Sequence, residues 1–135
     1  MVELVFYEEV PGLSSEFFLK WFQTVCLSEN QTLGEVSLVL GGDDWLLEKN
    51  KEYLNHDYLT DIITFDYSGN GLISGDLLIS VDRVKENAIE YDVSFMEELN
   101  RVCVHGLLHL LGYKDDTESN KKIMHNKENH YLGIL

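Results

Sequence analysis

The sequence predicts a single α+β domain, in which a small mixed β-sheet is packed with helices. Its length of 135 residues matches one ordinary domain. A composition of 44% hydrophobic and 25% charged residues is typical of a globular chain that buries its own core. Strand and helix patterns first alternate, then give two adjacent strands and three helices, an order that favours the α+β class. No repeat or linker divides residues 1–135, so we expect one domain.

In the first half of the chain, strand and helix patterns alternate. Phe18, Phe22 and Val25 recur at helical spacing and define the first helix. A short apolar run that ends in two glycines indicates the second strand, and the Asp that follows is typical of a helix N-terminus. The expected elements are, in order, a strand within 1–10, a helix over 14–29, a strand over 36–42 and a helix over 43–55.

The second half predicts two strands followed by three helices. The turn sequence Ser-Gly-Asn-Gly lies between two apolar runs, so we expect these to pair as antiparallel strands. Ser94 and Glu97 match a capping box, and Gly112 suits a helix end. The helix between them is apolar around most of its circumference and should lie buried against the sheet. The expected elements are strands over 60–67 and 72–80, and helices over 81–92, 95–111 and 119–132.

Two histidines interrupt that apolar helix, and they predict a metal site at its end. His105 and His109 are four residues apart, so both imidazoles lie on one helical face and can reach one ion. The chain turns at Gly112 and brings Asp115 or Asp116 near the open end of the pair. With Asp115 as the third ligand, two histidines and one carboxylate leave a coordination position open, which is typical of a catalytic site.

Other interpretations of the histidines are weaker. Two core histidines bonded to backbone are one alternative, but two desolvated imidazoles need partners. A zinc protease of the H-E-x-x-H type requires Glu directly after its first histidine, and this chain has Gly106 there. We expect His125 and His130 on the surface, and we leave His56, in a polar loop, outside the site.

Charge and cysteine content limit the partners and the compartment. The formal net charge of −14 argues against nucleic acid, because phosphate is bound through Lys and Arg. A bound divalent cation can still give an acidic protein one positive face. Cys26 and Cys103 sit in apolar helical patterns and are expected as reduced core residues. With neither a leader nor a membrane-spanning run, the chain is expected in the cytoplasm, away from membranes.

Three segments carry a resemblance to a known family. His105 to Asp115, "HGLLHLLGYKD", resembles the H-G-x-L-H-L-x-G-Y-D-H signature of the YbeY family of metal-dependent endoribonucleases. "NKEYLNHDYLTDIITF" (50–65) is similar to the family's N-x-x-Y-R…T-D-V-L-S-F segment, and "ISGDLLIS" (73–80) to its G-D-I-x-I-S strand. The resemblance implies one α+β domain with a metal at the end of a buried helix, and a role in ribosomal RNA maturation.

Two positions depart from the family pattern. The third metal-binding histidine of the family falls on Asp115. A carboxylate can also bind the metal, but its negative charge makes Mn²⁺ or Fe²⁺ more favourable as alternatives to zinc. The arginine of N-x-x-Y-R, a candidate for holding substrate phosphate, falls on Leu54. Arg101, one helical turn before His105, is the candidate to replace that cation.

The function we expect is a metal-dependent, single-strand-directed endoribonuclease that matures the 3′ end of small-subunit rRNA and serves ribosome quality control. The metal on His105, His109 and Asp115 would be one divalent ion, zinc before manganese or iron, that activates water or the RNA's 2′-hydroxyl. Asp61 is a second weak catalytic candidate beside Arg101. Thr60, Asp61 and Asp76 are expected to line the cleft, although turn chemistry explains them equally well.

Three other functions stay open. A metallohydrolase acting on peptides or small substrates would use the same ligands. A His-His-Asp iron oxygenase shares the triad of donors. A ribosome-assembly binding protein with a purely structural metal is favoured by the charge and by Leu54. The ribosomal RNA of the small subunit is the expected partner of both the endoribonuclease and the assembly protein. The sequence leaves the oligomeric state undetermined.

Overall fold

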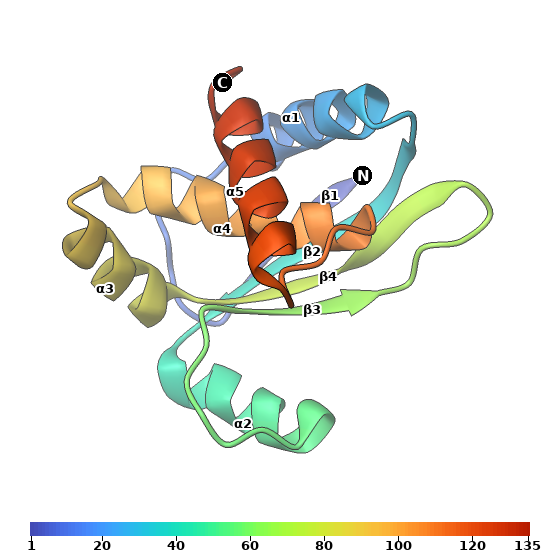
Figure 1. The fold of residues 1–135 in the computed structure, drawn as a ribbon. Helices are drawn as coiled ribbons and strands as arrows, with labels where there is room; N and C mark the ends of the chain where they lie inside the picture. Colours follow the sequence, from blue (N-terminus) through green and yellow to red (C-terminus); the bar gives the residue numbers. More distant parts are fainter.

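A computed structural model describes residues 1–135 as a four-stranded sheet with five helices (Figure 1). The predicted order of strands and helices is confirmed, and the second strand starts four residues earlier than expected. The elements are β1 (Val2–Phe6), α1 (Ser15–Ser28), β2 (Thr32–Gly41), α2 (Asp43–Leu54), β3 (Ile62–Asp66), β4 (Leu72–Ser80), α3 (Val81–Tyr91), α4 (Phe95–Leu110) and α5 (Glu118–Leu132).

The sheet is mixed, with strand order β1-β2-β4-β3. β1 and β4 both run parallel to β2, whereas β3 pairs antiparallel with β4, as the sequence predicts. The hairpin turns at Asn70 and Gly71, which have φ of 54° and 78°. Left-handed conformations at both positions match the right-handed twist of a two-residue hairpin, and Gly69 and Leu72 exchange backbone hydrogen bonds across it. The turn pairs β3 with β4, and because β2 occupies the other side of β4, β3 forms the edge of the sheet.

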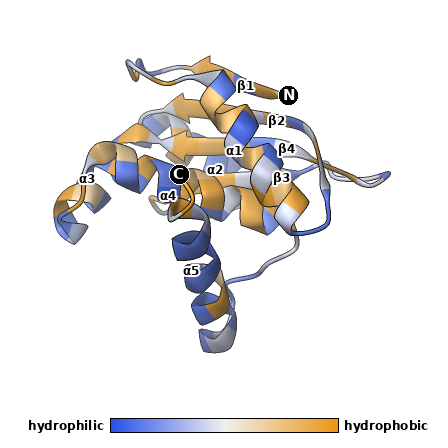
Figure 2. Ribbon diagram, turned by 90° about the horizontal axis from the view of Figure 1, so that it is seen from above, coloured by the Kyte–Doolittle hydropathy of each residue, from blue (hydrophilic) through white to orange (hydrophobic).

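The helices cover the two faces of the sheet unequally. In Figure 1, α1, α4 and α5 lie on one side and α2 lies on the other. The main core of 24 buried residues lies mostly between the sheet and the helices α1 and α4, with further residues from α3 and α5, whereas only Leu46, Ile63 and Leu78 make up the cluster under α2. Figure 2 shows that α5 is largely hydrophilic. No helix is both long and apolar enough to cross a membrane.

Helix α4 is buried, as its apolar pattern predicts, and at Gly106 it lies close against side chains of the sheet. A Cβ at this position would lie 2.7 Å from Ile62 Cδ1 and 2.9 Å from Leu77 Cδ2, so a larger residue would force these packed side chains to shift. Ser94 caps the helix by accepting a hydrogen bond from the Glu97 amide. The close approach brings His105, the neighbour of Gly106, to the edge formed by β3.

Both cysteines are unpaired and buried, as expected. Burial, reinforced by the nearby Glu29 carboxylate, raises the pKa of Cys26 to about 11. Burial alone raises the pKa of Cys103. Both thiols therefore remain protonated and belong to the core.

Candidate metal centre

Three side chains from α4 and the following loop converge at one point. The Nε2 atoms of His105 and His109 lie 3.0 Å apart. Asp115 Oδ2 lies 3.3 Å from His105 Nε2 and 3.4 Å from His109 Nε2. One donor atom from each residue thus lies within 4.8 Å of the other two, a grouping that could hold a metal ion.

The turn at Gly112 brings Asp115 to the histidines. Gly112 has a φ of 102°, and its amide donates to the His109 carbonyl at 3.0 Å, while the Tyr113 amide donates to Leu108 at 3.0 Å. This is the Schellman arrangement, which reverses the chain direction after a helix. The alternative ligand Asp116 instead accepts a hydrogen bond from Asn120 Nδ2 at 2.7 Å and lies outside the group.

The second nitrogen of each imidazole has a fixed partner. His109 Nδ1 lies 3.0 Å from the Tyr113 carbonyl, which only accepts, so Nδ1 carries the proton. His105 Nδ1 lies 2.6 Å from Glu128 Oε2. In neutral imidazoles with protonated Nδ1, both Nε2 lone pairs face each other and the Asp115 oxygen. Two lone pairs and a carboxylate around one point fit a cation, as in metal sites where a carboxylate or carbonyl orients each histidine.

The charges around His105 are closely coupled. Burial opposes the charged imidazole, but Glu128, Asp115 and Asp61 together raise its pKa above the ordinary value. Burial also favours a neutral Glu128, yet its bonds to His105 and to Arg101 lower the pKa of that carboxyl. The carboxylates around the donor atoms therefore favour a positive charge at this point.

The donors open into a cleft of about 420 Å³ between the end of α2, β3 and α4. Leu54, the position of the family arginine, lies in its wall, and no Lys or Arg lines it. Burial raises the pKa of Asp61, while His105 and backbone amides lower it, and the net shift is upward. The cleft lining consists of Leu54, Thr60, Asp61, Ile62, Ile63, Thr64, Asp66, His105, His109 and Asp115.

Asn50 fixes the loop that carries Thr60 and Asp61. Its side chain is buried and donates to the Tyr58 carbonyl at 2.9 Å. Asp61 in turn accepts a hydrogen bond from Asn87 at 3.3 Å. A loop without regular structure thereby presents a carboxylate to the cleft in a defined position.

The expectation that Asp76 lines the cleft is wrong. Asp76 pairs with Phe65 across the hairpin and lies on the opposite face of the sheet, in a groove with Trp45, because neighbouring strand residues alternate between faces. Arg101 also lies outside the cleft. Its guanidinium donates to Glu128 at 2.9 Å and to Asn129 at 2.8 Å, which directs it toward α5 rather than toward the cleft.

The remaining histidines lie away from the donor group. His56 is exposed and bonds to the Tyr58 hydroxyl at 3.0 Å. His125 and His130 are exposed on α5, as predicted.

Sequence reasoning missed Glu128. Its helix has a polar composition, yet Met124, Glu128 and Tyr131 are buried along one side at intervals of four and three residues. That spacing was a signal for an inward-facing stripe, in which a carboxylate needs a partner.

Comparison with known proteins agrees with this geometry. The family model described as endoribonuclease YbeY matches residues 8–135. The endoribonuclease YbeY of Flavobacterium psychrophilum is 48% identical over 118 residues, which cover 87% of this chain and 84% of that protein. The Flavobacterium johnsoniae endoribonuclease YbeY is 44% identical over 96% of this chain and 94% of its own length. The solution structure of TM1509 from Thermotoga maritima aligns over 98% of this chain and 87% of its own with a TM-score of 0.69 and 27% identity. The chain belongs to the YbeY family.

Proposed function

We propose that this protein is a metal-dependent endoribonuclease that cleaves single-stranded RNA during rRNA processing in the cytoplasm. Its substrate would be the 3′ end of small-subunit rRNA, with a further role in ribosome quality control. The observation that carries this proposal is the convergence of His105, His109 and Asp115 in an open cleft. The relatives named endoribonuclease YbeY support RNA as the substrate.

Zinc is the proposed metal, with Mn²⁺ and Fe²⁺ as alternatives. Two imidazole nitrogens and one carboxylate oxygen make the three-ligand set of catalytic zinc sites, while the carboxylate also suits harder ions. When bound, the ion would supply a Lewis acid that stabilises negative charge on the scissile phosphate and lowers the pKa of the nucleophile.

Asp61 is the proposed acid–base residue. It lines the cleft, and its raised pKa gives this carboxylate a greater proton affinity than a free Asp has. In the attacking step it would accept the proton of the nucleophilic hydroxyl, from water or from the RNA's 2′-hydroxyl. It would return that proton to the leaving oxygen as the P–O bond breaks.

The substrate must enter a cleft without protein cations. Its lining holds three carboxylates, those of Asp61, Asp66 and Asp115, so phosphate is repelled unless a cation occupies the donor group. Metal loading and RNA binding are therefore expected to be coupled. A flexible single strand can bring one phosphate to the ion while keeping the others in solvent.

A ribosome-assembly protein with a structural metal is the second candidate, and the missing cation at Leu54 is the observation that favours it. A peptidase of the H-E-x-x-H type is not supported, because the Glu position is Gly106, packed against Ile62 and Leu77 with no room for a side chain.

The test is cleavage of a single-stranded fragment from the 3′ end of precursor small-subunit rRNA. Metal-stripped protein is assayed alone, with Zn²⁺, with Mn²⁺ and with chelator, beside the same sequence in a duplex. We expect metal-dependent cleavage of the single strand. Tight RNA or ribosome binding without cleavage under any metal would support the assembly protein instead.

A further inference from the structure

We propose that helix α5 orients the metal site, by holding each of the two histidines through a separate chain of hydrogen bonds. This inference rests on the proposed metal centre and extends it to positioning residues. Glu128, secured by Arg101, holds His105. Lys127 and Tyr131 hold His109 through Glu29 and Tyr113.

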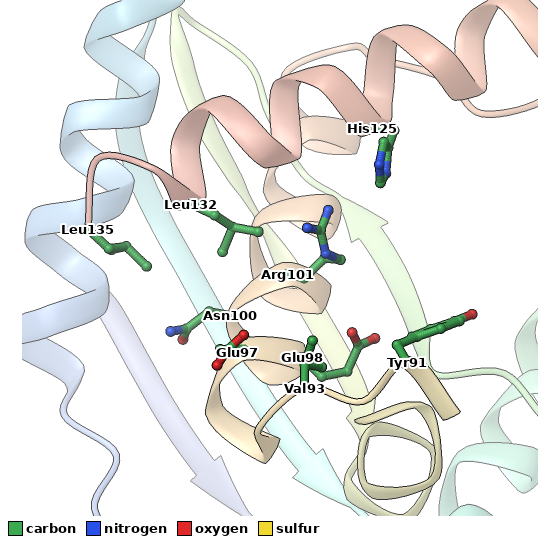
Figure 3. A pocket seen from close by; sticks show the side chains of 9 residues that line it. All are labelled: Tyr91, Val93, Glu97, Glu98, Asn100, Arg101, His125, Leu132 and Leu135. Carbon is green, nitrogen blue, oxygen red and sulfur yellow. The ribbon is translucent and has the colours of Figure 1, made fainter. Parts of the chain in front are cut away.

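The first chain ends on His105. Glu128 Oε2 lies 2.6 Å from His105 Nδ1, and Glu128 Oε1 accepts from Arg101 at 2.9 Å. Each oxygen of the carboxylate therefore has its own partner, and Arg101 is itself oriented by donating to Asn129 at 2.8 Å. Figure 3 shows the Arg101 side chain extending from α4 toward α5. The Glu128 side chain is only 8% exposed, so water competes weakly for its oxygens.

The second chain ends on His109. The Tyr113 carbonyl faces His109 Nδ1 at 3.0 Å, and the Tyr113 hydroxyl donates to Glu29 at the end of α1. Glu29 also accepts from Lys127 Nζ at 3.0 Å and from the Tyr131 hydroxyl. Through these bonds Glu29 connects the loop after Gly112 to both α1 and α5. Its side chain is only 12% exposed, so water competes weakly for them.

The two chains have the same chemical result. Each places an acceptor at Nδ1, which keeps the proton there and leaves Nε2 free to bind a metal. A neutral histidine without such a partner is free to carry its proton on Nε2, the form that cannot coordinate from that atom. Lys127 and Glu128 are adjacent in α5, so one helix sets both ring orientations.

The tautomers can be measured directly in metal-free protein. Long-range ¹H–¹⁵N correlation spectra distinguish the protonated from the unprotonated ring nitrogen of each histidine. In the wild type at mildly alkaline pH, both His105 and His109 should show protonated Nδ1. Glu128→Gln should shift His105 alone toward the Nε2-protonated form, because the amide can also donate to Nδ1. Tyr113→Phe should change His109 more than His105, because it releases the loop from Glu29.

Zinc affinity gives an independent readout, measured by competition with a chromophoric chelator. Loss of such an orienting partner typically costs about 10–100-fold in metal affinity, and we expect Glu128→Gln in this range. Glu90→Gln, an exposed carboxylate on α3, is the matched control and should bind zinc as the wild type does. Arg101→Gln leaves the bond between Glu128 and His105 in place and should lose less.

Thermal melts establish which variants are folded. If Glu128→Gln is unfolded, Tyr113→Phe, which removes only one oxygen, takes its place in the test. A folded Glu128→Gln protein that binds zinc within twofold of the wild type would overturn the proposal. So would a wild-type His105 protonated at Nε2. If the wild type binds zinc and the variants lose it, yet no RNA is cleaved, the proposed function fails while this inference stands.

Discussion

Replacing Leu54 with arginine should increase RNA affinity, because the cleft has no cation of its own. Leu54 lies in the cleft wall and is 41% exposed, so the longer side chain can extend without displacing the core. An arginine about 4 Å from a phosphate gains ~4 kcal/mol at an effective dielectric constant of about 20. Fixing its side chain costs about 1.5–2 kcal/mol, and desolvation takes a further part. The remainder of about 1–2 kcal/mol corresponds to roughly 5–30-fold tighter binding.

The assay is binding of a single-stranded RNA fragment by the zinc-loaded protein as a function of salt. One added phosphate contact should steepen the dependence of log affinity on log salt by about 0.7. Leu27→Arg is the matched control, because Leu27 is 70% exposed on α1 and the substitution changes the net charge equally. If both variants tighten binding alike, only net charge matters. If neither does, phosphate does not lie beside Leu54 and our placement of the substrate is wrong.

Three other predictions test the fold and the site. Gly75→Ala should lower stability by about 1–3 kcal/mol, because the new Cβ would lie 2.3 Å from the Phe65 carbonyl; Gly69→Ala, which meets no atom within 4 Å, is the control in chemical denaturation. Glu29 has a folded-state pKa below its ordinary 4.5, despite burial, through its bonds to tyrosines and lysine, so its contribution to stability is complete above about pH 4.5 and lost as pH falls through the lower folded value. As pH falls, the free energy of unfolding measured with urea should therefore decrease more for the wild type than for Glu29→Gln. An equal decrease with pH in both proteins would contradict the lowered pKa. Asp61→Asn should slow cleavage about 10²–10⁴-fold while zinc affinity stays within a few-fold; an unchanged rate would remove Asp61 from the mechanism.

The order of elements was predictable because each one has a strong local signal. The turn at Asn70 and Gly71 determines the hairpin, and apolar periodicity with the cap at Ser94 determines α4. The start of β2 was missed because Thr32, Gly34 and Glu35 around Leu33 give no strong strand pattern, and the segment becomes strand by pairing with β4. Sheet order was not predictable either, since the crossover from β2 to β4 depends on tertiary packing.

The donor group was predictable because helical spacing is a local rule. His105 and His109 share a face by geometry alone, and Gly112 predicts the reversal that brings Asp115 back. The pairing of these ligands with their partners was not predictable. The spacing in α5 indicates that Glu128 faces inward but not that it meets His105, and Glu29 comes from the end of α1, 84 residues before Tyr113.

For Arg101, the sequence predicted the helical face but not the partner that covers it. Arg101 occupies the predicted helical stripe, but α5 packs over it and takes up its charge. Periodicity places a residue on a face, whereas the identity of what covers that face depends on the rest of the chain.

The central claim is that the metal held by His105, His109 and Asp115 performs chemistry rather than maintaining the fold. The most direct measurement is cleavage of the single-stranded rRNA 3′ fragment by His109→Ala in the presence of Zn²⁺, with thermal melts of the same samples. We predict a folded protein without cleavage activity, since the core of 24 buried residues forms without any metal ligand. An unfolded variant together with an unfolded chelated wild type would contradict this account and identify the metal as structural. Cleavage at the wild-type rate by the folded variant would contradict it equally.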